Sequence, residues 1–395
     1  MGSRLTLTIS TADGGRVTWE FIGSGYGHDA AMAMFTVADC IEDAYDPDGE
    51  QSRLVYETTA RVAADRLACY GFGFRASMLA AEAGLEEPTN YPGLHPRLES
   101  GETLQALVDG WTAAMIDPSL RSDISERGNE VLLKLMDGLF EAGSVFPMLH
   151  GLSLALGGLP PNTLVQADLS DSDWVAERED GEVFLQDFVP LELISLTAAS
   201  VLCEGVFDSR VIEHAIKRTH SHLTDYLLVA RFDFNREGSS SALTRLVRGL
   251  ADVAATGPRG LDDAPRIIAV FDADRAGVLE ANRLAAAGLP SNFTVLTLPE
   301  RPELSTYPVL TPTGVEPHDV NYWGAAIETY LAIELDVTAP LVLSYDHGAA
   351  GGYQGALERD GKAAVQRAFE EAVQVRDHWP ILESIVQHIV HASSR

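Results

Sequence analysis

Residues 267–277 read Ile-Ile-Ala-Val-Phe-Asp-Ala-Asp-Arg-Ala-Gly, and the predicted fold follows from this stretch. Five apolar residues precede two carboxylates, and Pro265 and Gly277 bound the run. A short, β-branched apolar run with such boundaries is typical of a buried strand in a parallel sheet. Ligand sites in open α/β sheets lie just beyond the carboxyl ends of these strands. We therefore expect a ligand site at Asp272 and Asp274.

The spacing of these two aspartates favours a metal ion. Residues two apart in a strand share a face, and two adjacent anions repel each other unless a cation lies between them. Carboxylate oxygens suit Mg²⁺ or Mn²⁺. Taken alone, the pair is equally compatible with an Asx turn at the end of a strand, where Asp is common for backbone reasons.

A second stretch favours the metal site. Residues 199–208 read Ala-Ser-Val-Leu-Cys-Glu-Gly-Val-Phe-Asp, another apolar run that ends in a carboxylate and a glycine. Together with the Asp-x-Asp-x-x-Gly stretch, it resembles the Toprim catalytic domain of topoisomerases, bacterial primases, recombination proteins and OLD-type nucleases. The resemblance covers residues 199–300. It implies that Glu204, Asp272 and Asp274 form a carboxylate cluster, which Asp208 could join.

The pattern around these motifs alternates between strand and helix, which predicts a parallel sheet with right-handed crossovers. Asp233 lies near the end of the second predicted strand and is a possible outer carboxylate, although a solvated strand end is the simpler interpretation. The predicted strands are 199–203, 226–234, 266–271 and 293–298, and the predicted helices are 209–220, 241–255 and 276–288.

The first part of the chain, residues 1–185, predicts a mainly helical domain with one β-hairpin. The alternating residues 4–10 and 16–22 flank a turn at Asp13-Gly14. After an acidic loop at 42–50, one helical pattern is expected at 55–70, and a second helix follows it and ends near residue 83. A Pro- and Gly-rich connector at 88–101 separates these from three further expected helices, at 103–115, 129–142 and 146–156. Polar residues 159–183 predict a surface segment or a domain junction.

Residues 57–72 of this domain resemble the N-terminal region of HEPN/Toprim-type bacterial proteins. The Arg and later His that RNA-cutting HEPN domains carry at short spacing are not found in residues 1–190. We therefore expect packing, dimerisation or partner contact from this domain rather than RNA cleavage.

Residues 195–300 are expected to form the Toprim domain, and 301–395 an extension that completes its site. Residues 319–331 resemble the Asp-x-Asn-Gly…Ile-Glu segment that follows Toprim in nuclease-type relatives, although Tyr-Trp is interposed before Gly324. The resemblance implies metal-binding roles for Asp319 and Glu328, whereas a capped helix is the alternative. The segment from Gly351 onward resembles the family's C-terminal part and implies a catalytic role for Lys362.

Composition limits the class of protein. The chain has 395 residues, of which 46% are hydrophobic and 22% charged, as in a globular protein. Its apolar segments are too short to span a bilayer, so we expect no membrane association. Three cysteines without a C-x-x-C pattern favour a reducing compartment, the cytoplasm, over a disulfide framework or a zinc site.

The formal net charge of −30 is unusual for a nucleic-acid enzyme, because phosphate contacts usually need a basic face. Residues 200–300 contain 11 basic and 13 acidic side chains, so most of the negative charge lies outside the predicted Toprim domain. An acidic surface keeps a protein soluble, but it also predicts weak binding to bare DNA unless a basic partner subunit contributes.

Two functions remain open at this point. The resemblance implies an Mg²⁺- or Mn²⁺-dependent endonuclease or nickase acting on DNA, in antiphage defence or DNA repair, that uses Glu204, Asp272, Asp274 and Lys362. The alternative is a catalytically silent Toprim module that serves as a binding or scaffold subunit. A topoisomerase would need a tyrosine in a separate breakage domain, and a primase a zinc module; the sequence indicates neither. The apolar clusters around 70–74 and 145–150 would mark a protein–protein interface if they were exposed, and equally they could fill the core of the N-terminal domain. The resemblance to nuclease-type Toprim proteins favours a homodimer.

Overall fold

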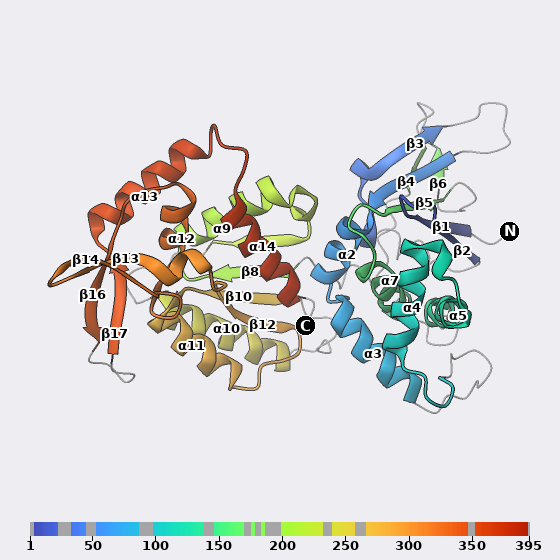
Figure 1. The fold of residues 1–395 in the computed structure, drawn as a ribbon, viewed down its shortest axis with the longest axis horizontal. Helices are drawn as coiled ribbons and strands as arrows, with labels where there is room; N and C mark the ends of the chain where they lie inside the picture. Colours follow the sequence, from blue (N-terminus) through green and yellow to red (C-terminus); the bar gives the residue numbers. More distant parts are fainter. Residues whose placement is uncertain are drawn as a thin grey trace. The chain divides into compact units, whose positions relative to one another are not determined.

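The computed structural model describes residues 4–22, 33–44, 53–86, 98–137, 146–169, 175–177, 183–185, 199–231, 239–256, 266–346 and 352–393. The chain divides into two compact units, residues 1–196 with 394–395 and residues 197–393 (Figure 1). The predicted segments 195–300 and 301–395 both fall almost wholly in the second unit.

A five-stranded antiparallel sheet forms one layer of the first unit. The predicted hairpin is present as β1 (Arg4–Ser10) and β2 (Arg16–Ile22), which pair from Arg4↔Ile22 to Ser10↔Arg16. Their sheet continues through β5 (Leu164–Asp168), β4 (Arg53–Thr59) and β3 (Cys40–Ala44), in the order β2-β1-β5-β4-β3. The hairpin is therefore the edge of a larger sheet in a mixed α/β unit.

Two sequence expectations for this unit were wrong. The segment predicted as a helix from residue 55 continues as strand β4 to Thr59, whose hydroxyl accepts a hydrogen bond from Val62 N and caps α2 (Ala60–Cys69). The polar segment 159–183 contains β5, which pairs with β1 on one side and β4 on the other. Its burial alternates, since Val165 and Ala167 are buried beside polar neighbours, and its short length concealed this pattern.

Helices supply the other layer of the first unit, namely α2, α3 (Phe74–Glu86), α4 (Leu104–Ile116), α5 (Asp123–Asp137) and α7 (Phe146–Gly157). They share one core with the sheet, in which Leu7, Ile9 and Trp19 pack with helix residues. Phe72, Met148 and Leu149, from the two segments expected to form an interface, belong to this core. These residues do not form an exposed patch, so the expected homodimer rests on the resemblance alone. A small hairpin, β6 (Val175–Glu177) and β7 (Val183–Leu185), completes the described part.

The second unit contains the predicted parallel sheet, in the order β12-β10-β8-β9. Its strands are β8 (Ala199–Cys203), β9 (Leu227–Ala230), β10 (Ile267–Phe271) and β12 (Phe293–Thr297), and all neighbouring strands are parallel. All five residues of β10 are buried, which is expected for an inner strand covered on both faces. The strand predicted at 226–234 corresponds to β9, which spans Leu227–Ala230. Residues 232–234, which include Asp233, lie outside the described residues.

Helices cover both faces of this sheet. On one side, α10 (Ser239–Thr256) and α11 (Arg275–Ala285) pack together, and their Leu243 and Leu284 share a core with Ala269 and Phe271 of β10. On the other side, α9 (Val206–Thr219) packs against α14 (Pro380–Ser393), as Figure 1 shows. The expected α/β sheet flanked by helices is thus confirmed.

The C-terminal extension adds a second four-stranded sheet that the sequence did not predict. Strands β13 (Tyr307–Thr311), β14 (Gly314–His318), β16 (Leu341–Asp346) and β17 (Gly352–Leu357) form it, in the order β14-β13-β16-β17. Pro308 and Pro317 lie opposite each other in its outer pair and masked the strand pattern. Between β14 and β16 lie β15 (Gly324–Ala325) and α12 (Ile327–Glu334); α13 (Arg359–Ala372) follows β17.

Contacts between the two parts of the second unit explain why they form one body. Strand β15 pairs with β11 (Ala273–Asp274), the segment directly after β10. Helix α14 contacts β12 and α12 as well as α9. The extension is therefore joined to the parallel sheet at the strand end where the aspartates lie. Among the helices of the described ranges, none combines the length and the apolar character needed to cross a bilayer.

Candidate functional site

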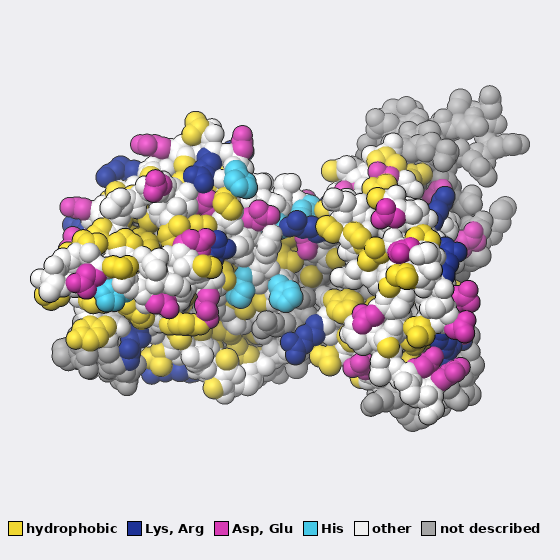
Figure 2. Space-filling view, viewed as in Figure 1, with side chains coloured by type: hydrophobic (Ala, Val, Ile, Leu, Met, Phe, Trp, Pro, Cys, Tyr) yellow, Lys and Arg dark blue, Asp and Glu magenta, His cyan; other side chains and the backbone are white. Residues whose placement is uncertain are grey.

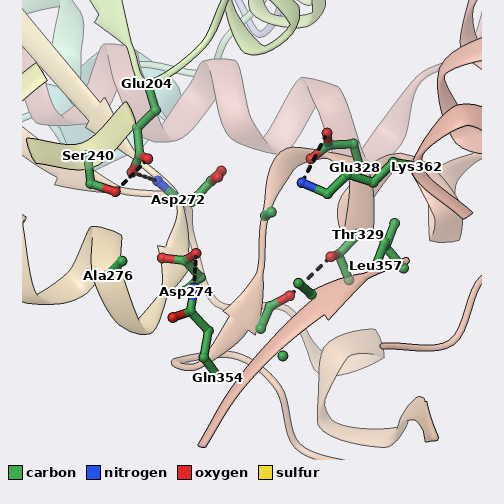
Figure 3. A pocket seen from close by; sticks show the side chains of 14 residues that line it. Glu204, Ser240, Asp272, Asp274, Ala276, Glu328, Thr329, Gln354, Leu357 and Lys362 are labelled. Atoms are coloured by element: carbon green, nitrogen blue, oxygen red, sulfur yellow. Dashed lines mark hydrogen bonds and ion pairs between the residues drawn. The ribbon is translucent and has the colours of Figure 1, made fainter. Parts of the chain in front are cut away.

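A pocket of about 250 Å³ lies at the carboxyl end of β10. Its position agrees with the rule that ligand sites in α/β sheets follow the strand ends. Both the parallel sheet and the extension contribute to its walls, which consist of Glu204, Ser240, Asp272, Asp274, Ala276, Gly324, Ala326, Glu328, Thr329, Gln354, Gly355, Ala356, Leu357 and Lys362. The sequence-predicted Glu204, Asp272, Asp274, Glu328 and Lys362 are thus brought together around one space (Figure 3).

Glu204 is buried at the end of β8, and both of its carboxylate oxygens accept hydrogen bonds. Oε2 accepts from the hydroxyl of Ser240 at 2.8 Å, and Oε1 accepts from the backbone N–H of Asp272 at 3.0 Å. This approach needs a glycine at position 277, where a Cβ would lie 2.9 Å from Glu204 Oε1 and 2.2 Å from the carbonyl oxygen of Asp272. Glu204 therefore joins β8, β10 and α10 at the base of the pocket.

Asp272 follows β10 and occupies the electrostatic centre of the site. Its Oδ1 accepts a hydrogen bond from the backbone N–H of Ile327 at 3.1 Å, at the start of α12. Burial raises its pKa well above the usual range, and four neighbouring carboxylates raise it further, namely Asp208, Glu204, Asp274 and Glu328. In Figure 3, Asp272 lies between Glu204 and the Glu328–Lys362 pair. Mutual repulsion of this kind marks a place where a cation would be stabilised.

Asp274 has a structural and a pocket-facing role at once. Its Oδ1 accepts from Gly277 N at 2.7 Å and so caps α11, as the alternative Asx interpretation expects. Its Oδ2 accepts from the side-chain amide of Gln354 at 3.1 Å, across the pocket from β17 (Figure 3). The second aspartate is therefore fixed from both parts of the unit.

Glu328 and Lys362 form the opposite wall. Glu328 is 7% exposed on α12, and its Oε1 lies 3.8 Å from Lys362 Nζ. The lysine, on α13, is 44% exposed in its side chain and so reaches solvent as well as the pocket. Among the described residues that line the pocket, Lys362 is the only Lys or Arg, against the four carboxylates of Glu204, Asp272, Asp274 and Glu328.

The remaining predicted residues lie elsewhere. Asp208, in the first turn of α9, is outside the pocket wall, but burial and the nearby Glu328 and Glu204 raise its pKa to about 7. Asp319 is exposed and is not part of the wall; its Oδ1 accepts from Asn321 N at 3.1 Å and from Asn321 Nδ2 at 2.9 Å. Asp319 therefore makes a local Asx turn. The alternative of a helix capped by Asp319 is wrong, because α12 begins at Ile327 and its N-cap residue is Ala326.

The pocket offers carboxylate oxygens, the type of ligand that hard divalent cations take. They come from the carboxyl end of β10 and the start of α12, and Mg²⁺ is commonly held by one or two carboxylates with water and phosphate oxygens. Within the described ranges, no three His, Cys, Asp or Glu side chains lie close enough to hold one ion. The pair Asp272 and Asp274 is the simplest protein contribution, because both line the pocket and repel each other.

Two polar residues of the site were missed by sequence reasoning. Ser240 opens α10, and its serine-rich surroundings gave no signal beyond that of an ordinary helix start. Gln354 lies in the segment from Gly351 onward, for which the resemblance implies a role only for Lys362. Both reach their carboxylates over long sequence separations, which local patterns do not encode.

The site was also compared with known proteins. A scan against protein-family models, a search of curated proteins and a search of solved structures each gave no match.

Proposed function

We propose that the chain is an Mg²⁺- or Mn²⁺-dependent hydrolase that cuts phosphodiester bonds of nucleic acid, as a DNA endonuclease or nickase. The observation that carries the proposal is the position of Asp272, among four other carboxylates that raise its pKa and beside an open pocket. Such a concentration of negative charge costs stability unless a cation relieves it. Strained or perturbed groups of this kind concentrate at functional sites.

The resemblance to Toprim domains supports the same reaction. The two motifs that carry it end neighbouring parallel strands, β8 and β10, and their Glu204, Asp272 and Asp274 line one pocket. Glu328 and Lys362, which the resemblance implies from the later segment, line that pocket too. The antiphage or repair context and the homodimer remain part of the proposal on the strength of the resemblance, and a cytoplasmic location remains part of it because of the cysteine pattern.

The residues of the chain divide the work as follows. Asp272 and Asp274 would hold the cation, which when bound supplies a Lewis acid that polarises a phosphoryl oxygen and an attacking water. Glu204 and Gln354 position these aspartates through the hydrogen bonds described above. Lys362, exposed at the wall, would pair with a phosphate oxygen and stabilise the charge that develops on it. Glu328 holds the lysine toward the pocket.

A silent binding module is the second candidate, and two observations favour it. No cluster of three metal-ligating side chains is formed among the described residues, and the net charge is −30. A scaffold subunit needs no metal cluster, and a basic partner would balance its negative charge, so this candidate is consistent with both observations. Such a module would bind no divalent cation at the pocket, so titration with Mn²⁺ separates the two candidates.

The direct test is cleavage of supercoiled plasmid and circular single-stranded DNA with Mg²⁺ or Mn²⁺. The proposal expects nicks or breaks that EDTA prevents and that Asp272→Asn abolishes. Asp319→Asn is the matched control, because Asp319 carries the same charge outside the pocket. Cleavage that survives both EDTA and Asp272→Asn would refute the proposal, as would Mn²⁺ binding that Asp272→Asn leaves unchanged.

A further inference from the structure

An exposed row of apolar side chains crosses the sheet β14-β13-β16-β17 of the second unit. Val315 pairs with Leu310, and Leu310 pairs with Val342. Val342 pairs in turn with Ala356, so the four residues stand side by side on one face of the sheet. Val315 is 58% exposed and Leu310 is 41% exposed, while Ala356 is exposed and Val342 half-buried. Contiguous exposed apolar side chains of this kind mark a contact surface.

The opposite face of the same strands packs inside the unit. Val309, Leu341 and Leu357 alternate with the residues of the row, and all three are buried. The row therefore belongs to the outer face of a sheet whose inner face already has its core. A sheet with one solvated face normally carries polar side chains there, so an apolar row on that face indicates that something covers it.

The neighbouring rows on the outer face carry no charge either. One row pairs Pro308 with Pro317, and the other pairs Ser344 with Gln354. The chain as a whole has a net charge of −30, and Figure 2 shows acidic side chains spread over the visible surface. Two copies of so acidic a chain repel each other unless they meet where charge is absent. The three uncharged rows are such a place.

The apolar row is also complementary to itself. A two-fold axis through its middle would set Val315 against the partner's Ala356 and Leu310 against the partner's Val342, so that a larger side chain meets a smaller one each time. Three strand spacings and five residues along a strand give the face dimensions of about 14 Å by 17 Å. This is about a third of the roughly 800 Å² that each partner buries in a standard interface, so the dimer should be weak and reversible.

The row ends at the pocket. Ala356 lines the pocket, as does Gln354 on the same face of β17, so a copy that covers the row lies next to the pocket wall. We propose that a second copy of this chain docks on the row of Val315, Leu310, Val342 and Ala356, and that the two pockets of the dimer flank this one interface. The inference gives a location to the homodimer of the proposed function, and it does not depend on hydrolysis.

Sedimentation of the whole chain across the micromolar range tests the inference. The parent should shift from the chain mass toward twice that mass as its concentration rises. Val315→Glu should raise the dissociation constant of the dimer at least about tenfold, because an unpaired charge would be buried at the interface. Added salt should strengthen the parent dimer, since it screens the repulsion between two acidic chains. Val253→Glu is the matched control, because Val253 is 67% exposed on α10, outside this sheet, and it should sediment as the parent does.

A charge pair tests the two-fold arrangement. Ala356→Lys alone should weaken the dimer, and mixing it with Val315→Glu should restore a dimer, because the two new charges then face each other across the axis. Thermal unfolding checks that each variant folds as the parent does. The inference is overturned if the parent stays monomeric at every concentration, if Val315→Glu dimerises as the parent does, or if the mixture stays monomeric.

Nucleic-acid binding and cleavage, measured on the same samples, separate this inference from the proposed function. A monomeric parent that cleaves would reject the inference alone. A dimer that Val315→Glu disrupts, without any cleavage, would reject the proposed hydrolase and retain the interface. A monomeric parent whose Val315→Glu variant loses nucleic-acid binding would overturn the inference and assign the row to the substrate.

Discussion

The carboxylate of Glu204 accepts a hydrogen bond from the backbone N–H of Asp272 at 3.0 Å, so one predicted acid holds the backbone that presents the other. The same carboxylate accepts from Ser240 at 2.8 Å. Both oxygens of Glu204 are therefore engaged within the protein. Its first role is to position Asp272, and only its remaining lone pairs are open to a cation.

Removing the hydroxyl of Ser240 tests how much its hydrogen bond to Glu204 contributes to stability and to the position of Asp272. Ser240→Ala leaves a buried carboxylate short of one charged hydrogen bond, which costs about 1.5–3 kcal/mol of the free energy of unfolding. It should also weaken Mn²⁺ binding, because Asp272 is less firmly held. Urea unfolding and Mn²⁺ titration measure the two effects. Ser241→Ala, at an exposed position of the same helix, is the control and should change neither. Equal stability of the two variants would show that the hydrogen bond from Ser240 to Glu204 contributes little to the free energy of unfolding.

Neutralising Asp272 should have opposite effects on activity and on stability. Asp272→Asn removes a charge that four carboxylates repel, so the metal-free protein should unfold at a higher temperature than the parent. The same change should abolish metal-dependent cleavage and reduce the stabilisation that Mg²⁺ gives. Thermal unfolding with and without Mg²⁺ checks this. A lower unfolding temperature in the metal-free variant would mean that the hydrogen bond to Ile327 N outweighs the repulsion.

Asp208 predicts a pH dependence of stability. Its pKa is raised to about 7 from 3.8, mainly by burial and then by Glu328 and Glu204. A carboxyl group with a raised pKa in the folded state contributes stability below its unfolded pKa and loses it as the pH rises through the folded value. The metal-free protein should therefore lose stability between about pH 4 and about pH 7.

Thermal unfolding across that pH range measures the loss, and Asp208→Asn is the comparison. The variant should show a shallower decline, because its side chain does not ionise. Added Mg²⁺ should stabilise the parent more at the upper end of the range than at the lower end, where the acids are protonated. A parent and a variant with the same slope would place the titration on other groups.

Gly277 predicts a steric requirement at the base of the pocket. Gly277→Ala would place a Cβ 2.2 Å from the carbonyl oxygen of Asp272, so the backbone must shift, at a cost of about 1–3 kcal/mol. Gly249→Ala, within α10, meets nothing within 4 Å and should stabilise the protein by about 0.5–1 kcal/mol. Denaturant unfolding of the two variants should therefore differ in sign. Tolerance of alanine at position 277 would show that the segment after β10 adapts easily.

Much of the parallel sheet could be predicted because its strands are short apolar runs bounded by polar residues. Strand β8 begins and ends at the predicted residues, 199 and 203, and β10 differs only by its first residue. Strand β5 could not be predicted, since five residues of alternating burial lie within an acidic stretch. In the second sheet of the extension, Pro308 and Pro317 masked the pattern of the outer strands β13 and β14.

The candidate site divides along similar lines. A carboxylate at a strand end can be recognised from the neighbouring apolar residues and glycine in the sequence, so Glu204, Asp272 and Asp274 could be placed from their motifs. Ser240 and Gln354 could not, because each acts on a residue distant in sequence through a contact that only the folded chain creates. Asp319 was placed in the site by its motif, but its side chain only accepts hydrogen bonds within its own local turn.

The origin of the pocket wall has a consequence for the synthesis of this protein. The wall draws on residues from 204 to 362, and Gln354 and Lys362 enter it from β17 and α13, which are translated after all the strands of the parallel sheet. A growing chain can complete the strands of the parallel sheet once residue 297 has emerged, yet it lacks a closed pocket until residue 362 is free to fold. Partly translated chains therefore carry the acidic strand ends without the side chains that complete the site.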